Sequence, residues 1–153
     1  MYTRLRNLLA ATHMLKVFVG IGNVLRHDDG VGVYIAGKIL ENQHIRVISA
    51  EVSIENYIGK INAINPDKII LIDSMYLGQK PGYCRLLTLE KLADFSTHTH
   101  NISIRTISDL FMSEILILGI QPASVSFGEG LSIPVQNKAD RIVSIINNSY
   151  SCF

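Results

Sequence analysis

Five side chains of types that bind metal ions or move protons lie at the ends of apolar runs or in the loops that follow them. Asp28 and Asp29 follow the apolar run VFVGI and its loop, Asp73 ends the apolar run KIILID, and His98 and His100 lie in the polar stretch STHTHN. Two carboxylates and one imidazole, with coordination positions left open, suit a divalent ion such as nickel, zinc, cobalt or iron. These residues lie far apart in the sequence, so they form one site only if the fold brings them together.

The same side chains also have plainer structural interpretations. Asp29 directly precedes an expected helix, whose positive end is expected to lower the pKa of the carboxyl group and keep it ionised. Either Asp28 or Asp29 is also a typical residue to cap this helix. Asp73 ends a buried strand, where a carboxylate destabilises the fold unless it is paired or coordinates a metal. Asp73 is also a typical residue to begin a turn. His100 is interpreted as a metal ligand or proton carrier, or as a surface histidine. His98 is interpreted as an exposed loop residue or as a partner that orients a metal ligand.

The spacing of apolar residues predicts strands and helices in alternation. An apolar stripe of Val31, Ile35, Ile39 and Leu40 indicates the first helix, and Ser53 is expected to cap the second. Strands are expected at 16–20, 44–50, 68–73, 83–89 and 114–120, and helices at 31–40, 53–64, 102–111 and 134–147.

This alternation predicts an α/β fold with three layers, in which a twisted, mostly parallel five-stranded sheet has helices on both faces. Residues 1–153 form a single domain in this prediction. Residues 1–13 are expected to be a disordered or non-native extension, because the strand opens directly after Met14. Ligands bind at the carboxyl ends of parallel strands, so Asp29, Asp73 and His100 are expected to meet at one edge of the sheet.

Composition excludes several classes of partner. Lys and Arg number 14 and Asp and Glu 13, so the net charge of +1 offers no basic field for nucleic acid or anionic lipid. The apolar runs are too short to cross a membrane, and no targeting segment is recognised. Cys84 and Cys152 suggest neither a disulfide framework nor a zinc site. We therefore expect a cytoplasmic protein with no nucleic-acid or membrane partner.

Two glycines leave a different function open. Gly20 and Gly22 follow a strand, and Glu51 ends the next strand, where a dinucleotide-binding protein places its ribose-binding acid. Leu25 stands where that pattern has a third glycine, and about eight residues separate Gly20 from the helix. A Rossmann-like nucleotide-binding protein therefore stays an alternative, as does a metal-dependent peptidase with another substrate.

Four segments resemble one known family, the nickel-iron hydrogenase maturation endopeptidases. They are GIGNVLRHDDGVG, IILID, THN followed by an apolar helix, and LGIQP with GLSIPV after it, within about Leu15 to Ile146. The last segment resembles the branch that serves formate-linked or energy-converting hydrogenases. The sequence departs from many relatives at Ser49, Ala50 and Glu51, where they carry Asp-Gly-Gly.

The resemblance implies a nickel-dependent endopeptidase that removes the C-terminal extension of the hydrogenase large-subunit precursor after nickel insertion. It places Asp29, Asp73 and His100 on the family's metal ligands and gives them the catalytic role. The nickel is presented largely by the precursor, and other divalent ions such as zinc or cadmium also fit the site. The expected partner is that precursor, and the enzyme is expected to be a monomer.

Overall fold

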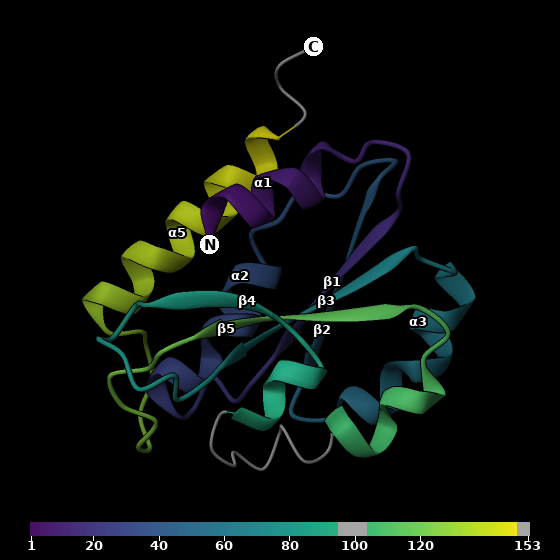
Figure 1. The fold of residues 1–153 in the computed structure, drawn as a ribbon. Coiled ribbons are helices and arrows are strands. Elements are labelled where there is room, and N and C mark those ends of the chain that lie inside the picture. Colours follow the sequence, from purple (N-terminus) through teal and green to yellow (C-terminus); the bar gives the residue numbers. More distant parts are fainter. Residues whose placement is uncertain (95–103, 150–153) are drawn as a thin grey trace.

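Five strands alternate with helices along the chain and form one twisted sheet (Figure 1). The computed structural model describes residues 1–94 and 104–149. The strands lie in the order β2-β1-β3-β5-β4, with β4 antiparallel to β5 and the other pairs parallel. The strands are β1 Lys16–Ile21, β2 Ile45–Glu51, β3 Lys68–Ser74, β4 Cys84–Thr88 and β5 Glu114–Ile120. The predicted five-stranded, mostly parallel α/β fold is confirmed.

Helices cover both faces of this sheet (Figure 1). Alternate residues of a strand point to opposite faces, and in β3 Ile70 and Ile72 join one buried cluster while Ile69 and Leu71 join the other. Helices α1, α2 and α5 pack on the first face, and η2 and α3 pack on the second. The helices are α1 Tyr2–Ala10, η1 His27–Gly30, α2 Val31–Ala36, η2 Ile54–Tyr57, α3 Ile58–Ile64, η3 Glu90–Asp94, η4 Ser108–Leu110 and α5 Ile133–Asn148.

The helix after β1 is shorter than predicted, and its position is set by close backbone packing. Helix α2 ends at Ala36, and Leu40 is exposed instead of joining the buried stripe. A Cβ atom at Gly32 would lie 2.1 Å from the carbonyl oxygen of Ile72 and 2.3 Å from that of Ile21. The start of α2 therefore lies directly against the carboxyl ends of β1 and β3.

The helix expected to begin at Ser53 has a different start. It divides into the 3-10 turn η2 and the α-helix α3, and the Ser53 side chain makes no capping hydrogen bond. The predicted cap is therefore wrong, although the buried Ile54 and Ile61 lie on the expected apolar face.

The N-terminal segment is part of the core, which corrects the expected disordered extension. Leu5 and Leu9 of α1 are fully or almost fully buried and share a cluster with residues of α5. The Lys16 ammonium donates to the carbonyl oxygens of Ala11 and Met14, at 2.6 and 3.1 Å. Burial of two leucines and these hydrogen bonds hold the segment in place. In the described ranges, no helix has the length and apolar character needed to span a membrane.

A polar cluster on the surface links α2 to α5. The Tyr34 hydroxyl donates to Asp140 at 2.7 Å, and the Lys38 ammonium contacts both groups. Its hydrogen bond with Tyr34 raises the pKa of Lys38, and the hydrogen bond from Tyr34 lowers the pKa of Asp140. The contact therefore favours the ionised pair and helps to fix α2 beside α5.

Candidate active site at the carboxyl edge of the sheet

Two acidic residues predicted as site residues lie at the carboxyl edge of neighbouring strands. Asp29 is in η1, which follows β1 and contacts β3, and Asp73 is near the end of β3. Their exposed fractions are 4% and 0%. His98 and His100 lie outside the described residues. Within the described ranges, no group of three His, Cys, Asp or Glu side chains is arranged to hold a metal ion, so the three-ligand site stays a prediction.

The loop after β1 holds Asp29 in a defined position. The backbone N–H of Asn23 donates to Asp29 Oδ2 at 3.0 Å. Gly22 has a φ of 137°, and a Cβ atom there would lie 1.8 Å from the Asp29 carbonyl oxygen, so a side chain at Gly22 would displace Asp29. Gly30 precedes α2 and no side chain caps that helix. Asp29 therefore binds its own loop, and the helix-cap interpretation is wrong for both acidic residues.

Asp28 serves a purpose that sequence reasoning missed. Its buried carboxylate accepts hydrogen bonds from the backbone N–H groups of Ala123, Ser124 and Ser132, at 2.8, 3.3 and 2.7 Å. It also accepts one from the Ser132 hydroxyl at 2.8 Å. Asp28 thus binds the loop after β1 to the loop after β5. Nothing in the sequence near Asp28 signals partners about a hundred residues away.

Gln121 is a second anchor at this edge. Its side chain is buried, and its amide oxygen accepts hydrogen bonds from the N–H groups of Leu77 and Gln79, at 2.6 and 3.4 Å. The loop that follows Asp73 and β3 is thereby held against the end of β5. The segment LGIQP contains this glutamine. A polar residue at the end of a buried strand is the sequence signal that could have identified Gln121 as a functional residue.

His27 has a backbone conformation that is unfavourable for a residue with a side chain. Its φ is 45°, in the left-handed region. Such a conformation costs about 1–3 kcal/mol and persists only where surrounding contacts enforce it. The His27 N–H donates to the Gly128 carbonyl at 2.7 Å, and ring atom Nδ1 lies 3.1 Å from the Gly130 carbonyl oxygen. The loop after β5 therefore holds His27 next to the acidic pair.

The glycines of the first segment serve packing within the protein. A Cβ atom at Gly20 would lie 2.4 Å from the Gly32 carbonyl oxygen and 2.6 Å from the Ala36 Cβ atom. The short helix α2 is preceded by Asp28 and Asp29, whose negative charges would repel a phosphate at that position. Glu51 is exposed, and its backbone carbonyl accepts from the Gly22 N–H. This geometry lacks the phosphate-binding turn of a dinucleotide site.

The donor chemistry at this edge fits a divalent metal ion. Asp29 and Asp73 supply carboxylate oxygens from two different elements, and both are shielded from solvent. Carboxylates combined with an imidazole and open positions are typical of catalytic or transient metal sites in proteins. The described residues therefore supply two carboxylates of the chemistry that a divalent ion binds, and the imidazole ligand stays a prediction.

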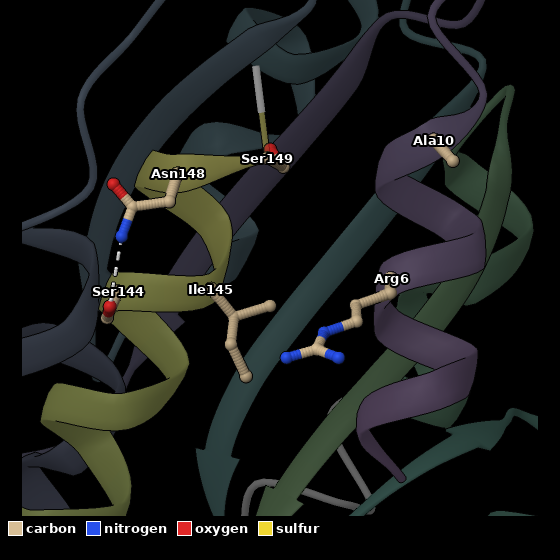
Figure 2. A pocket seen from close by; sticks show the side chains of 6 residues that line it. All are labelled: Arg6, Ala10, Ser144, Ile145, Asn148 and Ser149. Atoms are coloured by element: carbon tan, nitrogen blue, oxygen red, sulfur yellow. Dashed lines mark hydrogen bonds between the residues drawn. The ribbon is translucent and has the colours of Figure 1, made fainter. Parts of the chain in front are cut away.

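A separate hollow lies far from these acidic residues (Figure 2). It has a volume of about 380 Å³ and lies between α1 and α5, where Arg6 extends from α1 toward Ile145. Helix α5 begins near the carboxyl edge, and Ser144 and Asn148 lie toward its other end. At 1.5 Å per residue a helix of this length spans about 24 Å, so this hollow does not belong to the candidate site.

Comparisons with known proteins agree with one another. The sequence model of the HycI hydrogenase maturation protease family matches residues 31–149. The hydrogenase 3 maturation protease of Escherichia coli K12 is 27% identical over 135 residues, which cover 84% of this chain and 86% of that protein.

Solved structures give the same result. The crystal structure of the [NiFe] hydrogenase maturation protease HycI from Thermococcus kodakarensis KOD1 has a TM-score of 0.82 and 26% identity, covering 97% of this chain and 99% of that one. The hydrogenase maturating endopeptidase HybD from Escherichia coli shares the fold, with a TM-score of 0.72. It is 19% identical in sequence, and the match covers 86% of this chain and 88% of that one. The chain therefore belongs to the hydrogenase maturation protease family and is a protease.

Proposed function

We propose that this protease removes the C-terminal extension of the nickel-iron hydrogenase large-subunit precursor once nickel has been inserted. The observation that carries the proposal is the pair of buried carboxylates, Asp29 and Asp73, at one edge of the sheet in a member of this family. The enzyme acts in the cytoplasm as a monomer with the precursor as its partner.

Nickel enters this reaction as part of the substrate. Asp29, Asp73 and His100 complete the coordination of the nickel that the precursor presents, and zinc or cadmium can take the same position. The Asn23 N–H fixes one oxygen of Asp29, so the carboxylate needs little reorientation when the precursor binds. The scissile peptide is thereby held next to the two acidic residues.

Hydrolysis also needs a base for the attacking water. The precursor's nickel supplies Lewis acidity to the scissile carbonyl or to the water, and one of the two carboxylates takes the water proton. Burial at 4% and 0% exposure keeps bulk water away from Asp29 and Asp73. In such a site, electrostatic interactions with the reacting groups are stronger than in water.

The test compares wild type with Asp29→Asn, Asp73→Asn and His100→Gln on nickel-loaded precursor, following the loss of the tail by mass spectrometry. We expect each variant to lose at least about a hundredfold in rate, as for removal of a general base or a metal ligand. His98→Gln is the matched control for His100 and is expected to retain activity. Circular dichroism establishes that each variant is folded.

Two results would contradict this proposal. Complete tail removal by all three variants would show that these residues do not form the site. Equal cleavage of nickel-loaded and nickel-free precursor would show that the enzyme does not recognise the nickel, and would favour a peptidase with another recognition signal.

A further inference from the structure

Exposed apolar side chains gather at the edge of the sheet that contains Asp29 and Asp73. In the described part of the chain, ten large hydrophobic side chains are exposed, and six of them follow the carboxyl ends of parallel strands. The six are Val24 and Leu25 after β1, Val52 after β2, Tyr76 after β3, and Phe127 and Ile133 after β5. Contiguous exposed apolar surface marks a binding site for another protein more often than chance.

Four of these residues lie on two loops that are bound to each other. We call Val24, Leu25, Phe127 and Ile133 the apolar rim. The Gly128 N–H donates to the Leu25 carbonyl at 2.8 Å, which places Phe127 and Leu25 on adjoining backbone segments. Asp28 holds Ser132, the residue before Ile133. The rim therefore stands on a fixed scaffold, and its exposure at 45% to 85% is a stable feature.

A hollow of about 270 Å³ opens where these two loops meet α2 and α5. Most of its lining is apolar, from Val24, Val33 and Leu131, and His27 and Gly30 complete the side nearest Asp29. This volume lies just below the roughly 300–1,000 Å³ of sites that take a drug-sized ligand. The hollow suits an apolar side chain of a bound polypeptide.

The rim is continuous with the candidate site. Val24 directly follows Asn23, whose N–H binds the Asp29 carboxylate, and Gly30 directly follows Asp29. Val24 and Gly30 both line the hollow, so the hollow lies beside the loop that holds Asp29. The net charge of +1 gives the chain no strong overall field to attract a substrate, so apolar contact at the rim would add affinity to the coordination of the nickel.

We propose that the apolar rim docks the precursor segment next to its scissile bond, and that the hollow takes an apolar side chain of that segment. This inference rests on the proposed function and adds the surface that selects the substrate. Rim residues contact the bound polypeptide away from the cleaved bond. Their loss therefore weakens binding of the ground state and the transition state alike, and changes KM more than kcat.

The experiment measures kcat and KM for tail removal from nickel-loaded precursor by wild type, Leu25→Ser and Phe127→Ser. We expect KM to rise about tenfold in each variant, as for truncation of an apolar interface side chain, with kcat within about twofold. Leu110→Ser and Met112→Ser are matched controls, because both residues are exposed and precede β5 at the opposite edge of the sheet. Both controls are expected to keep the wild-type KM.

The outcomes separate the two proposals. If wild type leaves the tail in place, the proposed function fails, and the docking proposal fails with it. If wild type cleaves the precursor but the rim variants keep its KM, only the docking proposal is overturned. Sedimentation velocity adds a further test: a dimer that either rim variant converts to monomers would show that the rim binds a second copy of this chain, against our proposal.

Discussion

Adjacent acidic residues at the carboxyl edge have different surroundings and therefore different roles. The Asp28 carboxylate accepts its hydrogen bonds from Ala123, Ser124 and Ser132, in the segment that follows β5. Asp29 instead accepts from Asn23 in its own loop. A buried carboxylate that accepts four hydrogen bonds is an anchor, since each donor would lose its partner if the acid were removed. Asp29 is left as the candidate ligand of the pair.

Replacing the anchor is predicted to destabilise the protein. Asp28→Ala removes the acceptor of the N–H groups of Ala123, Ser124 and Ser132, and a hydrogen bond to a charged group contributes about 1.5–3 kcal/mol. We expect the free energy of unfolding in urea to fall by about 3 kcal/mol. Asp109→Ala, at an exposed aspartate, is the control and is expected to change it by less than about 0.5 kcal/mol. Equal stability of Asp28→Ala and wild type would contradict the anchor.

At the scale of elements, the N-terminal helix shows how a segment without a strong sequence signal gains structure from packing. Helix α1 has only nine residues, and isolated helices of that length are marginal in water. Leu5 and Leu9 are nevertheless buried in the cluster that contains Ile142 and Ile146 of α5. The Tyr2 ring also contacts the cationic groups of Lys138 and Arg141. The helix is therefore stabilised by α5 more than by its own sequence.

Truncating one buried leucine tests this packing. Leu9→Ala is predicted to lower the free energy of unfolding by about 2–4 kcal/mol, because a fully buried side chain leaves a cavity. Asn7→Ala, on the exposed side of the same helix, is the control and is expected to leave stability nearly unchanged. Both values come from urea denaturation followed by circular dichroism. A Leu9→Ala protein as stable as the control would mean that residues 1–13 are a dispensable extension.

At the scale of the whole molecule, the sequence predicted those features that depend on local patterns. The apolar runs KIILID and EILILGI correspond to β3 and β5 almost residue for residue. The rule that ligands bind at carboxyl ends of parallel strands placed Asp29 and Asp73 at one edge. The anchors Asp28 and Gln121 were missed because their partners are distant in sequence, and α2 was predicted too long because its end depends on packing against the sheet.

The buried thiol of Cys84 offers a probe of the folded state as a whole. Cys84 lies in β4 with 4% exposure and belongs to the cluster that contains α1 and α5. Burial raises the pKa of this thiol, and the positive charge of Lys138 opposes the shift. Since the thiolate is the reactive form, the folded protein keeps Cys84 unreactive. In a Cys152→Ser background, we expect a thiol reagent to modify Cys84 only as fast as the protein unfolds.

The same burial makes stability depend on pH in a known direction. A folded-state pKa above the ordinary value of 9.0 means that the neutral thiol stabilises the fold below pH 9. This contribution is lost as pH rises above 9, because the thiol of the unfolded chain loses its proton at a lower pH than that of the folded protein. The resulting loss of stability is no more than about 1.4 kcal/mol per pH unit. We expect the free energy of unfolding of the Cys152→Ser protein to fall more steeply between pH 8.5 and pH 10 than that of Cys84→Ala in the same background. The difference between the two proteins cancels the titration of Lys16 and Lys38, whose pKa values are shifted in opposite directions. Parallel curves for the two proteins would mean that Cys84 titrates as an exposed thiol, and that β4 does not close the core.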